Sequence, residues 1–248
     1  MFNKEFYPTP RELIKLMLHN IDFKMVTSIL EPSAGKGDIV DSLIEKWEQV
    51  DYYGKKTRDI DTIEIDENLV KILKGKGYRV VHNDFLTYST FKKYDLIIMN
   101  PPFSNGDDHL LKALDMQKDG GSIVCLLNAE TIKNPYSNSR KVLIQKLNDL
   151  EAKIEYIQNA FVSAENKTGV EVALIKVFIP EVEKPSYIFE QLRNEEKYEE
   201  KEFSNEYQLI KNDLIEEIVH QYKIEIQAGI RLINEYNAMR PNILRNLD

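Results

Sequence analysis

Short apolar runs alternate along this chain with segments of helical pattern, and this alternation constrains the fold more than any other feature. The apolar runs predict strands at 25–30, 61–65, 78–82, 95–99, 122–127, 153–158 and 170–178. The segments between them predict helices at 38–47, 67–74, 107–116 and 139–151. Near-continuous apolar strands with helices between them are typical of a parallel sheet covered on both faces. Only the polar loop 160–169 separates the last two strands, so we expect an antiparallel hairpin there.

The composition changes near residue 180, which indicates a boundary between domains. Residues 181–203 hold eight acidic and four basic side chains and predict a solvated connector or an acidic helix face. Beyond Ser204 or Asn205, either of which could cap a helix, apolar residues recur at helical spacing up to Pro241. We therefore expect an α/β domain at 1–180, a connector at 181–203 and a helical segment at 204–248, which Gly229 could interrupt.

Charge and cysteine content narrow the class of protein. The chain of 248 residues carries a formal net charge of −8, which argues against a broad electrostatic grip on a polyanion. Its single cysteine, Cys125, lies in an apolar run and excludes an internal disulfide and a structural zinc site. The N-terminus lacks a basic leader with an apolar stretch behind it, and no apolar run approaches the ~20 residues that span a bilayer. We expect a cytoplasmic protein with no membrane partner.

The stretch SILEPSAGKGDIV, residues 28–40, predicts a ligand site where a strand passes into a helix. The strand ends at Glu31, a tight turn carries Gly35 and Gly37, and the helix starts near Asp38. Ligands of open α/β sheets bind at this carboxyl end of the strands, and glycines let them approach the backbone. The acidic Glu31 and the lack of a full GxGxxG or GxxxxGK[ST] pattern argue against a phosphate. We expect a ligand with a cationic group, with tight packing of the turn as the alternative.

The next two strand ends add acceptors for an adenosine. Glu64, Ile65 and Asp66 close the second strand, where an acidic side chain usually holds a ribose diol. One strand later, Asp84 can accept from an exocyclic amine and Phe85 can cover a purine face. The three strand ends describe a pocket for adenosine with a positively charged tail that is not a phosphate. S-adenosylmethionine fits this description better than NAD or ATP does.

The fourth strand ends in YDLIIMNPPFSN, residues 94–105, where the apolar run stops at an Asn-Pro-Pro-Phe turn. The side-chain oxygen of Asn100 and the backbone carbonyl of Pro101 are two acceptors for the two N–H bonds of a planar amine. Such acceptors localise the nitrogen lone pair and bind more strongly as positive charge develops on nitrogen. Pro102 restricts the residue before it to extended geometry, and an exposed Phe103 offers an unstacked base an aromatic face. A Pro-Pro strand terminator with a core phenylalanine is the alternative.

These motifs resemble the amino-directed, S-adenosylmethionine-dependent methyltransferases, in particular the N6-adenine DNA methyltransferases. The resemblance covers about the first 180 residues and implies a Rossmann-like class I methyltransferase fold, with a seven-stranded, mostly parallel sheet. FYPTP at 6–10 is similar to the family's N-terminal donor-binding segment, in which Thr9 would contact the methionine end. The resemblance implies S-adenosylmethionine without a metal as cofactor, a flipped adenine in DNA as substrate, and a role in restriction–modification.

The residues and the resemblance together define an expected site. The residues assigned to the reaction are Asn100, Pro101, Pro102 and Phe103. The residues assigned to the donor are Tyr7, Thr9, Glu31, Pro32, Ser33, Ala34, Gly35, Gly37, Asp38, Glu64, Ile65, Asp84, Phe85 and Asn100. Three alternatives stay open, namely methylation of a glutamine amide in release factors, methylation of an RNA base, and a non-catalytic donor-binding assembly subunit. The release-factor enzymes usually have tyrosine after the prolines and a helical domain in front, and neither is present here.

Other polar residues have weaker claims. Asp107, Asp108 and His109 could suggest a metal, but aspartate at a helix start is ordinarily a cap. Phe161 resembles an aromatic that some adenine methylases place on the other face of the flipped base, with core packing as the alternative. The loop 132–141 could contact a phosphate backbone or be simply solvated, and its candidates are Lys133, Tyr136, Arg140 and Lys141.

The order of the motifs, with the N-terminal segment first and the Asn-Pro-Pro-Phe turn after the donor loop, resembles the branch of adenine methylases in which a large C-terminal domain reads the sequence. The C-terminal segment of this chain departs from that pattern. Only about 65 residues follow the sheet here and their first third is acidic, so the segment is a poor reader of DNA. Its apolar stripe needs a partner surface. We expect the stripe to pack on the catalytic domain, to form a homodimer, or to anchor a separate recognition region.

Overall fold

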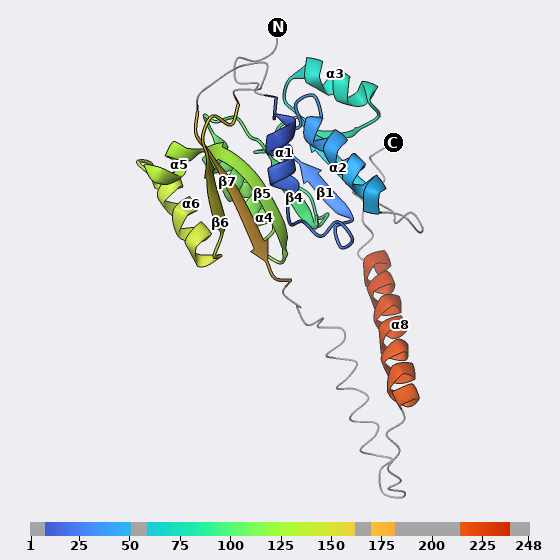
Figure 1. The fold of residues 1–248 in the computed structure, drawn as a ribbon. Coiled ribbons are helices and arrows are strands. Elements are labelled where there is room, and N and C mark those ends of the chain that lie inside the picture. Colours follow the sequence, from blue (N-terminus) through green and yellow to red (C-terminus); the bar gives the residue numbers. More distant parts are fainter. Residues whose placement is uncertain (1–7, 51–58, 162–169, 182–213, 239–248) are drawn as a thin grey trace, which may run out of the picture. The chain divides into compact units, whose positions relative to one another are not determined.

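The structure, a computed structural model, describes residues 8–50, 59–161, 170–181 and 214–238 (Figure 1). The chain divides into two compact units, Met1–Val182 and Glu183–Asp248. Tyr7, nearly all of the expected connector and both candidate caps at 204 and 205 lie outside the described residues. The expected connector and the start of the helical segment therefore stay predictions.

Seven strands form one sheet in the first unit, in the order β3-β2-β1-β4-β5-β7-β6. The strands are β1 (Ser28–Glu31), β2 (Asp59–Ile63), β3 (Arg79–His82), β4 (Leu96–Met99), β5 (Gly121–Asn128), β6 (Lys153–Ile157) and β7 (Val172–Ile179). The first five strands are parallel, and β7 pairs antiparallel with both β5 and β6. All seven expected strands and the expected antiparallel hairpin are confirmed, with β7 inserted between β5 and the edge strand β6.

Six helices of the first unit are described. They are α1 (Arg11–Leu18), α2 (Asp38–Val50), α3 (Glu67–Gly75), α4 (Gly106–Met116), α5 (Ala129–Lys133) and α6 (Asn138–Asp149). The four predicted helices correspond to α2, α3, α4 and α6, whereas α1 and α5 are not among the predictions. The pattern that would identify α1 is present, because Leu13, Ile14, Met17 and Leu18 recur at helical spacing after Pro10 and are all buried.

Two apolar cores lie on the two faces of the sheet, because successive side chains of a strand point to opposite faces. In β4, Leu96 and Ile98 pack in the core that includes α1 and α2, whereas Ile97 and Met99 pack in the core that includes α4 and α6. The whole of β4 is buried. Polar side chains that bind a ligand must therefore lie at or beyond the ends of the strands. The predicted ligand-binding motifs lie at the carboxyl edge of the sheet.

The second unit contains α8 (Leu214–Ala238). The helix continues through Gly229, so the expected interruption there is wrong. Glycine costs about 1 kcal/mol relative to alanine inside a helix, and 25 residues of helix tolerate that cost. The helix buries Ile224 and exposes an apolar stripe that includes Ile218, Tyr222 and Ile226. No described helix is both long and apolar enough to cross a membrane.

Candidate functional site

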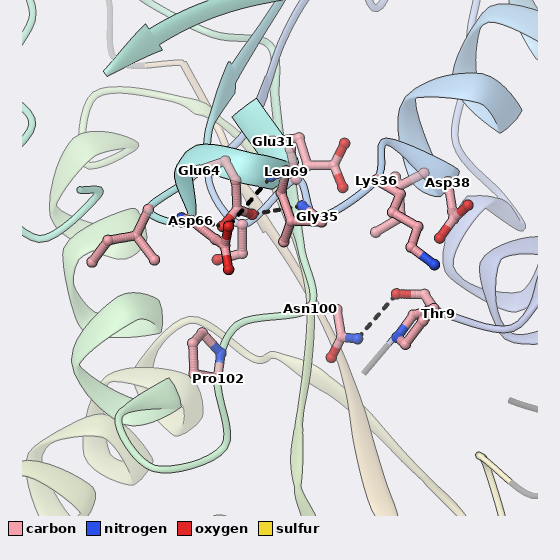
Figure 2. A pocket seen from close by; sticks show the side chains of 15 residues that line it. Thr9, Glu31, Gly35, Lys36, Asp38, Glu64, Asp66, Leu69, Asn100 and Pro102 are labelled. Carbon is pink, nitrogen blue, oxygen red and sulfur yellow. Dashed lines mark hydrogen bonds between the residues drawn. The ribbon is translucent and has the colours of Figure 1, made fainter. Parts of the chain in front are cut away.

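A pocket lies at the carboxyl edge of the sheet, where β1, β2 and β4 end (Figure 2). Its walls come from the segment before α1, the β1–α2 turn, the β2–α3 junction and the turn after β4. The lining residues are Pro8, Thr9, Glu31, Ser33, Ala34, Gly35, Lys36, Asp38, Ile39, Glu64, Ile65, Asp66, Leu69, Asn100 and Pro102. Parallel strands bring their carboxyl ends to one edge, so motifs that are distant in the sequence meet here.

The β1–α2 turn depends on two glycines with different tasks. Gly35 lines the pocket at a φ of 56°, and Gly37 has a φ of 87°. Both angles lie in the left-handed region that favours glycine. A Cβ atom on Gly37 would lie 2.9 Å from Cε2 of Tyr78, so packing against Tyr78 also favours glycine at this position. The turn is closed by the Gly37 N–H, which donates to the Ala34 carbonyl at 2.8 Å.

Glu64 ties the end of β2 to this turn. Its Oε2 accepts from the Gly35 N–H at 2.7 Å, and its Oε1 accepts from the Asp66 N–H at 2.9 Å (Figure 2). Burial raises the pKa of the Glu64 carboxyl, while the backbone N–H groups of Asp66 and Gly35 oppose that shift. Asp66 in turn caps α3 by accepting from the Asn68 N–H at 2.8 Å. The acidic end of β2 is thus held in place by backbone donors.

Glu31 is the most unusual group in the pocket. The residue is 1% exposed, and its Oε2 has no hydrogen-bond partner within the described part of the chain. Burial raises the pKa of its carboxyl well above the ordinary value, and the charges of Asp38, Glu64 and Asp41 raise it further. A buried, unsatisfied carboxylate is costly unless a cation or donor meets it. The pocket is therefore suited to a ligand with a positive charge, as the sequence predicts.

Lys36 is a pocket residue that the motif analysis does not single out. Its side chain extends past Asp38 toward Thr9 (Figure 2). Among the described residues that line the pocket, it carries the one positive charge beside the acidic Glu31, Asp38, Glu64 and Asp66. The sequence does contain a clue to Lys36, because it lies between Gly35 and Gly37. The left-handed backbone of these two glycines fixes the point from which the lysine side chain projects. The pocket can therefore accept a ligand that carries both charges.

The turn after β4 brings Asn100 to the same edge. The Asn100 Nδ2 donates to the Thr9 Oγ1 at 3.0 Å, which joins the segment before α1 to the end of β4 (Figure 2). Pro102 lines the pocket, whereas Pro101 is buried and is not a lining residue. The Asn105 N–H donates to the Pro102 carbonyl at 3.3 Å and closes the turn ahead of α4. The Asn100 side-chain amide and the β1–α2 turn therefore line the same pocket.

Phe103 does not have the exposure that the sequence predicts. The residue is half-buried and packs against the core, with its ring centroid 5.9 Å from that of Phe161 in an edge-to-face arrangement of 72°. Phe161 is fully buried, in agreement with the core-packing alternative and against a place for it on the open face of a base. Phe103 is less exposed than predicted because two neighbouring aromatic rings bury apolar area by packing together.

Four residues assigned to the donor do not line the pocket, and Tyr7 lies outside the described residues. Pro32 and Gly37 are both buried. Asp84 uses Oδ1 to accept from the Leu86 N–H at 2.9 Å. Phe85 is 2% exposed and lies under the ammonium of Lys112, which is 5.4 Å from its ring centroid. The assignment of Asp84 and Phe85 to the adenine stays a prediction.

The weaker candidates are held by neighbours within the protein. Asp107 and Asp108 lie in the first turn of α4, where negative charge is favourable, while Asn105 is the residue at the cap position. Asp107 faces Arg140 Nε at 3.7 Å. Lys133 pairs with Glu171 at 2.6 Å, so two cations of the 132–141 loop already face carboxylates. Among the residues that the structure describes, no group of three or more His, Cys, Asp or Glu could hold a metal ion.

Comparison with known proteins decides the family. The model of the N-6 DNA methylase family matches residues 3–131, more than half of the chain. The chain belongs to this family. It is also similar to the Type II methyltransferase M.CvrRI of Paramecium bursaria Chlorella virus XZ-6E, with 28% identity over 96 residues. That match covers 38% of this chain and 23% of the viral protein, so the chain spans only about a quarter of its relative.

Solved structures place this family member in the class I methyltransferase fold. A putative class I S-adenosylmethionine-dependent methyltransferase from Listeria monocytogenes superimposes with a TM-score of 0.53 at 12% identity, over 75% of this chain and 65% of the other. The methyltransferase subunit of a type I restriction–modification system from Streptococcus thermophilus gives a TM-score of 0.51 at 16% identity, over 69% of this chain and 44% of the other. At such low identity these likenesses show the fold alone, and they confirm the Rossmann-like class I prediction.

Proposed function

We propose that this chain is the catalytic part of an S-adenosylmethionine-dependent DNA adenine-N6 methyltransferase. The observation that carries the proposal is the buried Glu31 carboxylate, which has one oxygen without a partner in the described structure and shares its pocket with Asn100. A carboxylate in this setting favours a cationic ligand, and the methionine tail of S-adenosylmethionine carries an ammonium group. Membership of the N-6 DNA methylase family supports the same choice.

The charged end of the pocket fits the amino-acid tail of the donor. Glu31 and Asp38 would face the ammonium group, and Lys36 would face the carboxylate, which is bonded to the same α-carbon. An ion pair in a partly desolvated pocket is stronger than one in water, so this pairing of signs would favour a zwitterion over a simple cation. When bound, S-adenosylmethionine supplies a methyl group on a positively charged sulfur, which is activated for transfer to a nitrogen.

The strand ends on the other side fit a nucleoside. The Glu64 oxygens already accept one backbone N–H each, and each oxygen retains a lone pair that can accept from a ribose hydroxyl. Ile65 is 65% exposed at the rim of the pocket, which makes it available to cover a purine face. Burial of an aliphatic side chain against an apolar surface contributes about 1.5–3 kcal/mol. The pocket thus offers separate places for the tail and for the base.

The turn after β4 supports amine chemistry. Because Asn100 Nδ2 is committed to Thr9, its Oδ1 is the atom that would accept from the N6 amine, with the carbonyl of Pro101 as the second acceptor. Acceptors that meet developing positive charge are worth about 10²–10³ in rate for each group lost. Phe103, braced edge-to-face by Phe161, would support the flipped base. The proton released from the methylated nitrogen would leave through these acceptors to water.

DNA is the proposed substrate because the family model that matches the chain is that of the N-6 DNA methylases, and the named relatives include a Type II methyltransferase and a restriction–modification methyltransferase subunit. A modification role in a restriction–modification system follows from the same names, and cytoplasmic localisation follows from that role. Recognition of a sequence would need a surface beyond the described residues, because the net charge is −8 and two loop cations are paired internally. We propose that the apolar stripe of α8 joins the chain to a second copy or to a recognition region.

Transfer of a labelled methyl group tests the proposal. The full chain would be incubated with tritiated S-adenosylmethionine and with unmethylated duplex DNA, single-stranded DNA, RNA or a release-factor protein, followed by nucleoside or amino-acid analysis. We expect N6-methyl-2′-deoxyadenosine from DNA. Product from RNA or from glutamine would replace the proposed substrate by one of the alternatives. Donor binding without any product would favour an assembly subunit, and the absence of donor binding by calorimetry would refute the proposal.

A further inference from the structure

We infer that Thr9 is a positioning residue that sets the orientation of the Asn100 side-chain amide. Its hydroxyl would hold Nδ2, so that Oδ1 remains directed at the target amine. This inference rests on the proposed function, because it assigns Thr9 a part in the methyl-transfer step. The resemblance to the family implies only a contact between Thr9 and the donor, so a role through Asn100 is separate from it.

The contact itself is short and crosses a large distance in sequence. Asn100 Nδ2 lies 3.0 Å from Thr9 Oγ1, and the two residues are 91 positions apart. Thr9 is 9% exposed, so water competes weakly for its hydroxyl. The hydroxyl can still donate its own hydrogen elsewhere, because it acts as the acceptor toward Asn100. Thr9 is therefore placed between the donor pocket and the reacting amide.

The chemistry of an amide explains why its orientation needs to be held. One end of the Asn100 side chain accepts hydrogen bonds and the other donates them, and a half-turn about its last torsion exchanges the two. In the exchanged orientation an NH₂ group would face the NH₂ of adenine, so neither could accept from the other. The Thr9 hydroxyl can also rotate and donate to Oδ1, so it selects between the two orientations only when its own hydrogen is given to the bound S-adenosylmethionine. One hydrogen bond of about 1 kcal/mol then biases the two orientations by about fivefold.

Thr9 can perform this task because its backbone is unusually constrained. It lies between Pro8 and Pro10, and a residue that precedes proline is restricted to extended geometry. Pro10 is the cap residue of α1, and its carbonyl accepts from the Ile14 N–H at 3.0 Å. Thr9 therefore has little freedom relative to α1.

The helix that carries Thr9 is itself anchored to the sheet. Four side chains of α1 are buried in the core that also contains Leu96 and Ile98 of β4. At its other end, Lys176 Nζ of β7 donates to the carbonyls of Leu16 at 2.8 Å and His19 at 2.7 Å. The position of the Thr9 hydroxyl relative to the end of β4 is thus fixed by packing at both ends of α1.

Side-chain NMR of the full chain tests the contact without any substrate. In protein labelled with ¹⁵N-asparagine, the Asn100 amide pair is identified by its loss in Asn100→Asp. We expect Thr9→Val, which keeps the shape and loses the hydroxyl, to shift these resonances and to speed their exchange with water. Thr9→Ser, which keeps the hydroxyl, should leave them near their wild-type positions. Unmoved resonances in Thr9→Val would overturn the inference.

Single-turnover transfer at saturating donor to unmethylated plasmid DNA tests the consequence. A lost orienting hydrogen bond of about 1 kcal/mol should slow Thr9→Val by at most about fivefold, with Thr9→Ser within about 1.5-fold of wild type. Aspartate has two equivalent acceptor oxygens and needs no orientation, so Thr9→Val should cost less than about 1.5-fold in an Asn100→Asp background. Equal losses in both backgrounds, or a loss that Thr9→Ser does not rescue, would also overturn it. Failure of the wild type to bind the donor would instead refute the proposed function.

Discussion

Two buried carboxylates on neighbouring strands have opposite electrostatic surroundings. Glu31 ends β1 and Asp61 lies within β2, whose register places Asp61 beside Leu30. Each residue is 1% exposed. Asp61 accepts from Lys92 Nζ at 2.6 Å and from Tyr94 Oη at 2.7 Å, and it also pairs with Arg79. Glu31 instead has acidic neighbours and an oxygen without a partner in the described structure.

The pKa values of the two carboxyls move in opposite directions for this reason. Burial favours a raised pKa at both sites. At Asp61 the hydrogen bonds from Lys92, Tyr94 and Arg79 outweigh burial, so the pKa falls below its ordinary value. At Glu31 the neighbouring acids add to the effect of burial. Asp61 therefore belongs to the framework of the sheet, whereas Glu31 faces the pocket without the basic partners that Asp61 has.

Replacement of Asp61 should have the largest effect on stability. In Asp61→Ala, Lys92 and Arg79 lose their buried partner, so the free energy of unfolding should fall by about 3 kcal/mol in urea titrations at neutral pH. Because the pKa of Asp61 is lowered, its contribution is present at neutral pH and is lost as the pH falls below the usual carboxyl range. An unchanged unfolding free energy would remove Asp61 from the framework.

Replacement of Glu31 should show the reverse behaviour. Glu31→Gln keeps the shape of the side chain and removes its charge, so binding of S-adenosylmethionine measured by calorimetry should weaken by about 10–30-fold. The free energy of unfolding should stay level or rise by about 1 kcal/mol, because a costly buried acid is removed. Asp61→Asn is the matched control, and its donor affinity should remain within about threefold of wild type. Equal losses of donor affinity in both variants would erase the distinction between the two sites.

The pH dependence of donor affinity should follow the raised pKa of Glu31. An ammonium group binds the ionised carboxylate, so affinity should increase as the pH rises toward that pKa, by at most about tenfold per unit. For the free protein the sign is opposite, because the stability linked to the raised pKa is present at low pH and is lost as the pH rises through it. Calorimetry across pH on wild type and Glu31→Gln should show the dependence in the first and a flatter profile in the second. A wild-type profile as flat as that of the variant would assign the effect elsewhere.

Lys36 should make the smallest contribution of the charged groups in the pocket. Lys36→Met is expected to weaken S-adenosylhomocysteine by about five- to tenfold, while binding of its decarboxylated analogue should change by less than about twofold. Lys71, an exposed residue of α3, offers the control Lys71→Met, which makes the same change in net charge. If both ligands weaken equally in Lys36→Met, the lysine does not recognise the carboxylate.

The site residues that could be predicted from the sequence are those at the ends of strands. Glu31, Glu64 and Asn100 meet because parallel strands end at one edge, and each stands directly after a strand pattern that is easily recognised. All seven strands could be predicted because each is a short run rich in apolar residues, and strands covered on both faces are nearly continuous in this pattern. The contact of Thr9 with Asn100 could not be predicted, because it depends on how α1 packs.

Most differences between the sequence predictions and the structure concern side chains whose surroundings depend on tertiary packing. Phe103 turns its ring to Phe161, a residue from a distant loop, and so loses the exposure that its motif suggests. Two of the three cations of segment 132–141, Lys133 at the end of α5 and Arg140 in α6, meet Glu171 and Asp107 from other elements, so most of the expected loop is helical. Gly229 stays within α8 because local propensity is a weak preference compared with a long helix around it. For Phe103, Lys133 and Arg140 the deciding partner lies far away in the sequence.

The most direct test of the account compares donor binding with methyl transfer in Asn100→Ala. The donor is proposed to bind against Glu31 and Glu64, whereas the reaction is proposed to occur at Asn100. Donor binding and methyl transfer should therefore respond differently to this substitution. Calorimetry should give a donor affinity within about threefold of wild type, while transfer from tritiated S-adenosylmethionine to adenine in DNA should fall by at least about 10²-fold. Transfer that survives in Asn100→Ala at close to the wild-type rate would contradict the central claim that this turn is the reaction centre.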